Sequence, residues 1–190
     1  MQRRASIPAR INIIGEHTDY LGGLALPFAS EHRLMLTATK ADQTEGDATV
    51  VELWRAAGGW PAALEVKSTI PIGAGMSSSA ALCLAVVLCA NGPMDPFDAC
   101  LEAQRIEHQV LKTPCGLLDQ MAMMMSQEHH ATLIDFTAMT WDAFLIPESW
   151  MFKLVDSGVR RQLNQTEFGT SVDSSALQRH VTEENRRVQQ

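Results

Sequence analysis

The sequence predicts an α+β domain. Short segments in which apolar and polar residues alternate, typical of half-buried strands, recur along the chain, whereas residues 80–90 form an almost wholly apolar run that suits a buried helix. The chain has 190 residues, of which 46% are hydrophobic. That is sufficient for a core of ordinary globular size, in one domain or slightly more.

Strands and helices are expected in a mixed order along the chain. The expected strands cover residues 7–15, 33–40, 49–55, 63–69, 131–136 and 152–156. The expected helices cover residues 80–90, 95 to about 111, and 113–125, and residues 181–190 have a helix-compatible composition. The methionine-rich stretch within 121–125 is interpreted as core filling, because methionine packs irregular gaps well.

Composition argues against several classes of partner. A net charge of −7 disfavours nucleic acid and acidic membrane surfaces. No stretch has the length and apolarity of a membrane span, and no apolar signal segment follows the first four residues. The cysteines lack metal-ligand spacing and are interpreted as reduced core thiols: Cys83, Cys89, Cys100 and Cys115. We therefore expect a cytoplasmic protein.

A glycine-rich turn leads into the apolar helix. The segment PIGAGMSSSAAL (residues 71–82) has two glycines one residue apart, followed by three serines. Glycine lets the backbone turn sharply and approach a ligand, and the start of a helix offers unpaired N–H groups to an anion. The segment is not a Walker loop, because no Gly-Lys-Ser/Thr follows. It predicts a phosphate site, with a simple helix-capping turn as the alternative.

A second polar loop follows the first expected strand. Residues 15–23 place Glu16, His17 and Asp19 between glycines, directly after the strand. Carboxylates accept hydrogen bonds from hydroxyl groups, and an imidazole adds a further polar contact, so this density suits a polyol ligand. A metal site is the rival interpretation, but the other histidines offer no convincing third ligand.

Three separated motifs resemble those of the galactokinase branch of the GHMP kinases, a family of sugar and small-alcohol kinases. They are the segments RINIIGEHTDYLGG (residues 10–23), PIGAGMSSSAA (71–81) and CGLLDQ (115–120). Residues 157–163 also resemble a family segment. The first motif is specific to the galactokinase branch, and the resemblance covers roughly residues 5–170.

The resemblance implies a two-layer α/β sandwich of the GHMP kinase N-terminal type, like domain 2 of ribosomal protein S5. Its sheet is mostly antiparallel, with helices packed on one side. Residues 1–170 would form this domain. Residues 171–190 would be a divergent or truncated helical tail, with the family's C-terminal domain absent.

The resemblance also implies ATP-dependent phosphorylation of the anomeric hydroxyl of galactose or a related sugar. Asp119 would be the base that takes the hydroxyl proton, and Arg10 would keep that carboxylate ionised and neutralise charge on the transferring phosphoryl group. The implied ATP-binding residues are Pro71, Gly73, Ala74, Gly75, Met76, Ser77, Ser78, Ser79 and Ala80. The implied sugar-binding residues are Glu16, His17, Asp19, Gly116 and Phe168. The implied magnesium ligands are Ser78, Ser79 and Glu107.

The chain departs from the family pattern at three places. Residues 41–70 are shorter than the usual connection, Phe168 stands where galactokinases commonly have a sugar-contacting tyrosine, and the second domain is missing. We therefore expect that the 190 residues alone do not turn over sugar and that an exposed face promotes self-association. The alternative function is a non-catalytic sugar-binding regulator, or a degenerate relic, on a galactokinase scaffold.

Overall fold

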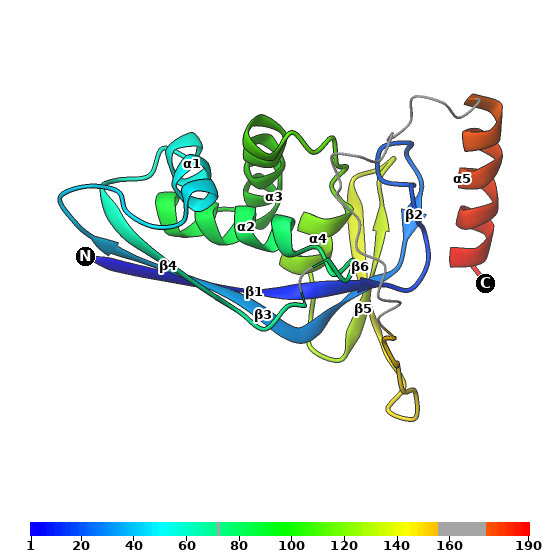
Figure 1. Cartoon of the computed structure of the whole chain (residues 1–190). Coiled ribbons are helices and arrows are strands. Elements are labelled where there is room, and N and C mark those ends of the chain that lie inside the picture. The colour runs from blue at the N-terminus through cyan, green and yellow to red at the C-terminus, as the bar shows by residue number, and fades with distance from the viewer. Residues whose placement is uncertain (72, 156–173) are drawn as a thin grey trace.

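The structure is a computed structural model that describes residues 1–71, 73–155 and 174–190. Its described part contains two antiparallel three-stranded sheets, with helices packed on one side of the larger sheet (Figure 1). The larger sheet has the order β1 (Gln2–Asn12), β3 (Pro27–Lys40), β4 (Ala62–Ser68). The smaller has the order β2 (Leu24–Ala25), β5 (His130–Asp135), β6 (Thr140–Leu145). The predicted α+β class and antiparallel pairing are confirmed.

One helix that covers the larger sheet lies between β3 and β4 in the chain, and the others lie between β4 and β5. They are α1 (Ala48–Ala56), α2 (Ser78–Asn91), α3 (Pro96–Ile106), the π-helix η1 (Glu107–Leu111) and α4 (Leu118–Met124). A further helix, α5 (Ser174–Val188), lies apart from these beside β2 (Figure 1). The second predicted helix thus continues as η1, and the third begins at Leu118 rather than at 113. The helical expectation for residues 181–190 is confirmed as far as Val188.

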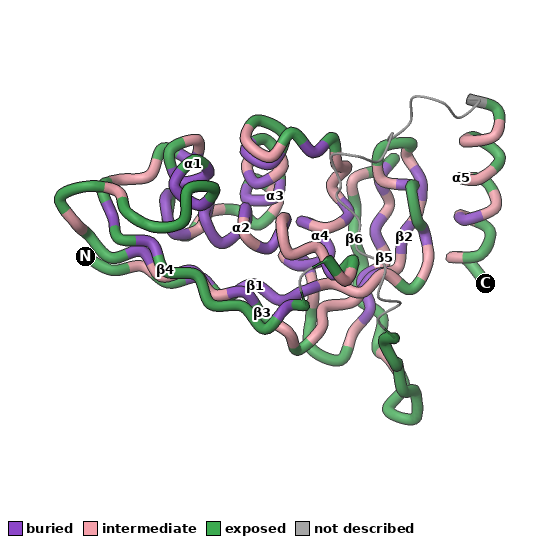
Figure 2. Tube along the Cα trace, viewed as in Figure 1, coloured by how far each residue is buried: buried purple, intermediate pink, exposed green. Residues whose placement is uncertain are grey.

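Helix α2 lies at the centre of the main core. Its apolar residues face every direction, and most of them are buried against β1, β3, α1 and α3. Figure 2 shows the buried positions gathered where these helices meet the sheet. The prediction of a buried helix over residues 80–90 is confirmed. The start of α2 is therefore held in place by the core of the domain.

The predicted strand over residues 7–15 is observed as β1, which begins five residues earlier and ends at Asn12, and its burial alternates only as far as Ile7, because Pro8 is buried as well. Ala5, Ile7 and Ala9 are buried on the helix-covered side. The register with β3 shifts between Pro8 and Arg10, so that β3 contributes extra residues opposite this point. Such irregularities bend a strand and redirect its side chains. Arg10 is the first paired residue after the shift.

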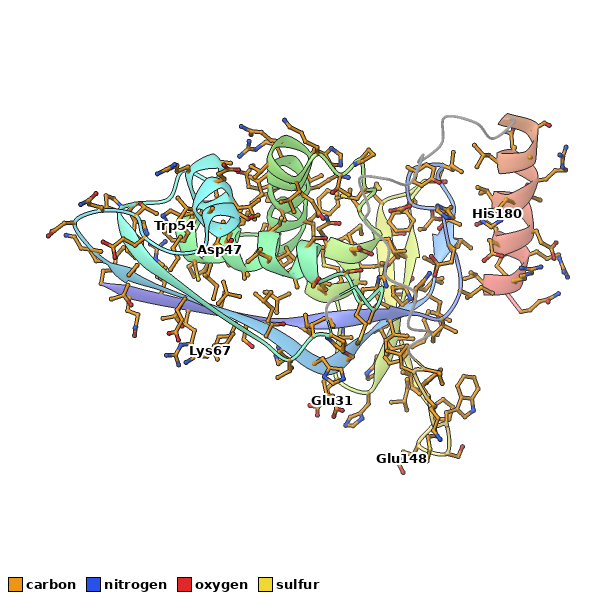
Figure 3. The ribbon with its side chains drawn as sticks, viewed as in Figure 1. Glu31, Asp47, Trp54, Lys67, Glu148 and His180 are labelled. Carbon is orange, nitrogen blue, oxygen red and sulfur yellow. The ribbon has the colours of Figure 1, made fainter. Side chains whose placement is uncertain are left out.

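The expected strand over residues 49–55 is wrong, because this segment is the helix α1. The side chain of Asp47 caps the helix by accepting hydrogen bonds from the backbone N–H groups of Thr49 and Val50. Trp54, which Figure 3 labels, is fully buried. Leu53 is also fully buried, and Val50 is buried one turn earlier. Burial at helical spacing on one face outweighs the strand preference of the two adjacent valines.

The expected strand over residues 152–156 is also wrong. Residues 152–155 have no regular structure and are exposed, while position 156 lies outside the described residues. The strand that pairs with β5 is β6 instead, and the short β2 was not expected either. All six β6 residues are exposed. Because the strand has no buried face, its sequence shows no regular alternation of apolar and polar residues.

Two further expectations concern the cysteines and the methionines. The four cysteines are free thiols, three of them buried. Met121, Met123 and Met125 are buried in the cores, as predicted.

Within the described ranges, no single helix has the length and apolarity of a membrane span, although α2 with the α3–η1 segment passes this test across a bend of 114°.

The N-cap of α1 gives a test of the corrected assignment. Replacing Asp47 with Ala should lower the free energy of unfolding by about 1 kcal/mol, because two backbone N–H groups lose their acceptor. Thermal denaturation should show a Tm lower by roughly 2–4 °C. The matched control is Asp42→Ala in the same exposed connection. Equal Tm values for the two variants would contradict the capping role.

Candidate active site

The Arg10 side chain joins two of the predicted motifs. Its Nε and Nη2 atoms each lie 2.8 Å from Oδ1 of Asp119, and its Nη1 donates to the carbonyl of Gly75 at 2.8 Å. Arg10 comes from the end of β1, Asp119 from the first turn of α4, and Gly75 from the turn before α2. The side chains of Arg10 and Asp119 keep 16% and 25% of their surface exposed. A paired and accessible carboxylate therefore lies beside the glycine-rich turn.

The glycine-rich turn leaves the start of α2 open to a ligand. Gly73 and Gly75 have φ values of +70° and +72°, which favour glycine. Ser77, the N-cap of α2, is itself left-handed (φ +58°), and its side chain makes no capping hydrogen bond. An added Cβ at Gly75 would meet nothing within 4 Å. The first N–H groups of α2 thus lack a side-chain cap, beside open space that an anion can enter.

Asp19 connects the polar loop after β1 to the start of α4. One of its carboxylate oxygens accepts a hydrogen bond from the Leu118 backbone N–H at 3.2 Å. The same carboxylate packs against Gly116, where an added Cβ would overlap it. Burial, and secondarily the nearby Asp119 charge, raise the pKa of Asp19 despite the Leu118 hydrogen bond. Gly116 is required here by the close approach of a carboxylate.

Glu16 and His17 lie exposed on the same loop. Asn12 donates to the Glu16 carboxylate at 2.9 Å, and the Tyr20 hydroxyl lies 2.9 Å from Nδ1 of His17. His17 adopts a left-handed backbone with φ +60°, which is uncommon for a residue with a Cβ. Both side chains thus make local contacts, and the His17 ring also packs edge-on against His180 of α5, with ring centroids 6.4 Å apart.

Glu107, the first residue of η1, is the buried carboxylate of the site. Only 2% of its surface is exposed, and it accepts a hydrogen bond from Nε2 of Gln120 at 2.8 Å. Burial raises the pKa of Glu107, while hydrogen bonds, chiefly from the Ser79 side chain, oppose the rise. Oε1 of Gln120 is buried without a partner among the described residues.

Glu107 and the neighbouring Ser79 carry oxygen atoms of the kind that magnesium binds. Mg²⁺ is usually held by one or two carboxylates, with the phosphates of a nucleotide and water completing its shell. A carboxylate next to a serine hydroxyl, at the start of a helix that suits phosphate, fits that pattern. The part of the chain that the structure describes has no cluster of three or more His, Cys, Asp or Glu suited to a metal. The nucleotide would have to supply the remaining ligands.

The structure brings several of the predicted site residues together. Arg10 contacts Asp119 and Gly75 directly. Asp19 contacts Gly116 and the backbone of Leu118, the residue before Asp119. Three predicted ATP-site residues are placed less favourably for side-chain binding, because Met76 and Ala80 are buried in the core and Pro71 is exposed beside the undescribed Ile72. Phe168 and residues 157–163 lie outside the described residues.

Gln120 is a site residue that the sequence analysis did not assign. It follows Asp119 directly, and its burial beside Glu107 could only have been inferred from its place in the CGLLDQ motif. Two surface hollows lie away from the site, one between α1 and η1 and one along β1, β3 and β4. The Arg10–Asp119 pair therefore lies on an accessible surface outside both hollows.

Solved structures share this fold. A galactokinase from Lactococcus lactis, crystallised with galactose, superposes with a TM-score of 0.73 at 20% identity, over 99% of this chain and 68% of that one. A mevalonate kinase from Methanococcus jannaschii gives a TM-score of 0.61 at 12% identity, over 76% and 56%. A putative sugar kinase from Campylobacter jejuni gives 0.58 at 16%, over 77% and 56%. The chain thus spans between about half and two thirds of the length of these enzymes.

Two family sequence models match adjoining parts of the chain. The galactokinase galactose-binding signature matches residues 3–40, which include β1 and the loop with Glu16, His17 and Asp19. The GHMP kinase N-terminal domain matches residues 47–127, which include the glycine-rich turn, Glu107 and Asp119. Together the two matches cover more than half of the 190 residues. The chain belongs to the GHMP kinase family and carries the signature of its galactokinases.

Proposed function

We propose that this chain carries the substrate-binding and catalytic residues of an ATP-dependent sugar-1-kinase of galactokinase type. Its substrate would be the anomeric hydroxyl of galactose or a close relative. The observation that carries the proposal is the position of Arg10, whose guanidinium bonds both the Asp119 carboxylate and the Gly75 carbonyl. A base for an alcohol and a turn suited to phosphate are thus held next to each other. Phosphoryl transfer depends mainly on such positioning and on charge stabilisation.

In the proposed reaction Asp119 accepts the proton of the sugar hydroxyl. Its partly exposed oxygens leave room for a hydroxyl to approach while Arg10 fixes the orientation of the carboxylate. The hydroxyl oxygen then attacks the γ-phosphorus, and ADP leaves with the electrons of the broken bond. The positive charge of Arg10 opposes the negative charge of the transferring group.

The sugar would be held by the loop after β1. Glu16, His17 and Asp19 offer two carboxylates and an imidazole, and Asp19 is already joined to the start of α4. Gly116 would allow the sugar-binding loop to approach the start of α4 closely. Phe168 is proposed as a further sugar contact. The match to the galactose-binding signature supports this placement.

The nucleotide phosphates would lie at the glycine-rich turn and the start of α2. Ser78, Ser79 and Glu107 would hold magnesium, which supplies charge neutralisation on the phosphates when bound. Support comes from the uncapped start of α2 and from the buried Glu107 beside Ser79. The small-molecule partners would therefore be the sugar and Mg-ATP. A cytoplasmic location is proposed on the basis of four free cysteines.

The nucleotide site can be tested at Gly75. Replacing Gly75 with Val should weaken Mg-ATP binding at least about tenfold, because a branched side chain would enter the open space expected to hold phosphate. The matched control is Gly58→Val, since Gly58 also has positive φ (+73°) and nothing within 4 Å of an added Cβ. Isothermal titration should show normal ATP affinity for the Gly58 variant. Equal ATP affinities for the two folded variants would refute the assignment of the turn.

The base can be tested at Asp119. In protein that shows sugar-dependent ADP release, Asp119→Asn should lower kcat by a factor of about 10² to 10⁴ and leave sugar affinity largely unchanged. The control is Asp98→Asn, an exposed aspartate in the first turn of α3. Unchanged turnover in a folded Asp119→Asn variant would place the base elsewhere.

The buried carboxylate predicts a pH-dependent cost to stability. Burial raises the pKa of Glu107 in the folded state, so ionisation of this carboxyl group destabilises the fold. The destabilisation is absent below the pKa of the unfolded state, about 4.3, and complete above the pKa of the folded state. Glu107→Gln should therefore raise Tm relative to the parent at about pH 7, and much less at about pH 3.5. The same variant should bind Mg-ATP more weakly. A Tm difference independent of pH, measured without metal, would contradict the assigned cause.

A further inference from the structure

Helix α5 forms hydrogen bonds with the loop that we propose to bind the sugar. The structure places α5 beside β2 and away from the helices that cover the larger sheet (Figure 1). Its side chains contact the backbone at the start of the loop, at Gly15 and Glu16, and at Leu24, where the loop meets β2. Three residues make these contacts: His180, Glu184 and Asn185. From the sequence, residues 171–190 were expected only as a helical tail without a role in the site.

Two consecutive residues of α5 hold the two ends of the loop. Glu184 accepts a hydrogen bond from the Gly15 N–H at 3.1 Å, and Asn185 accepts one from the Leu24 N–H at 2.7 Å. Gly15 and Leu24 lie against each other, because an added Cβ at Gly15 would overlap the Leu24 carbonyl. The base of the loop is therefore closed on one side by its own backbone and on the other by α5.

The Glu184 contact is buried and charged. Its side chain is 8% exposed, and Arg187 Nη1 donates to its second carboxylate oxygen at 2.8 Å. A hydrogen bond from a peptide N–H to a shielded carboxylate is stronger than one between neutral groups. Removing the carboxylate would leave the buried Gly15 N–H without this acceptor.

A second backbone group at the start of the loop also contacts α5. Nε2 of His180, labelled in Figure 3, lies 2.7 Å from the carbonyl oxygen of Glu16. Gly23 allows the close approach, since an added Cβ would come within 3.0 Å of Val181 and 2.9 Å of Asn185. The residues that α5 contacts therefore flank or include Glu16, His17 and Asp19.

We infer that α5 is a positioning element for the sugar-binding loop, with Glu184 as its principal residue. This inference rests on the proposed sugar-kinase function. Glu184 touches neither of the proposed substrates. It acts by fixing the peptide that carries Glu16, His17 and Asp19, so that less ordering of the loop is needed when sugar binds. The nucleotide side, which α5 does not contact through these three residues, should be unaffected.

The test compares four forms of the 190-residue chain: the parent, Glu184→Ala, Glu184→Gln and Glu183→Ala. Glu183 is the matched control, because it is the adjacent acidic residue, is 44% exposed and pairs with Arg186 and Arg187 rather than with the loop. The glutamine variant keeps an acceptor for the Gly15 N–H. Isothermal titration measures the Kd for D-galactose and for Mg-ADP. Hydrogen–deuterium exchange measures protection of peptides that cover residues 13–26.

The inference predicts a pattern across these variants. Glu184→Ala should raise the Kd for galactose about tenfold and speed exchange in residues 13–26, with an unchanged Kd for Mg-ADP. Glu184→Gln should recover most of the galactose affinity, and Glu183→Ala should match the parent. Equal galactose affinity in Glu184→Ala and the parent would overturn the inference. Equal losses in Glu184→Ala and Glu183→Ala would also overturn it, because they would indicate general destabilisation of α5.

Failure of the underlying function gives a different result. If the parent binds no galactose, the sugar-kinase proposal fails for this chain. The hydrogen–deuterium exchange data then test by themselves whether α5 holds the loop in place. Faster exchange in residues 13–26 confined to Glu184→Ala would still support the hold of α5 on the loop. Unchanged exchange in that variant would overturn it.

Discussion

The Arg10 guanidinium is the contact on which the arrangement of the site depends. Three segments far apart in the sequence meet there: the end of β1, the turn before α2 and the first turn of α4. Arg10 hydrogen-bonds to both Asp119 and Gly75, and so joins them through one side chain. An arginine can serve both partners because its planar group carries several donors in a fixed geometry. A lysine at this position could not reproduce the paired contact to Asp119 together with the Gly75 carbonyl.

Around this contact the domain accepts costs that a purely structural protein would avoid. Glu107 is buried and Asp19 half-buried, and burial raises the pKa of both carboxyl groups. Ser77 and His17 adopt left-handed backbone conformations that disfavour side chains with a Cβ. The apolar helix α2 offsets these costs, because its packing on almost every side fixes the start of the helix. Departures of this kind from local preference concentrate at functional sites.

Local sequence signals predicted the parts of the molecule that are locally determined. The apolar run of α2 and the glycines of the turn were readable from residue type and spacing. The strand prediction for residues 49–55 was wrong, because burial of Leu53 and Trp54 in the core favours a helix over a strand there. Strand β6 escaped notice because it has no buried face.

The contacts of α5 could not have been predicted in this way. Glu184 and its partner Gly15 stand at opposite ends of the chain, and nothing in the composition of either segment indicates the other. Gln120 is an intermediate case, since its neighbour Asp119 was assigned while its own contact to Glu107 was not. Long-range pairing of polar groups depends on the completed fold, whereas periodicity and turn residues report only the local backbone.

The central claim is that the sugar and the nucleotide bind side by side across the Arg10–Asp119 pair. It is tested most directly by NMR relaxation of ¹³C-labelled galactose in the presence of the chain and Mn-ADP, in which paramagnetic Mn²⁺ replaces magnesium. We expect a chain-dependent relaxation enhancement that is largest at the anomeric carbon and falls toward the far side of the ring. Enhancement that is uniform around the ring, or largest at a carbon remote from the anomeric centre, would contradict the account.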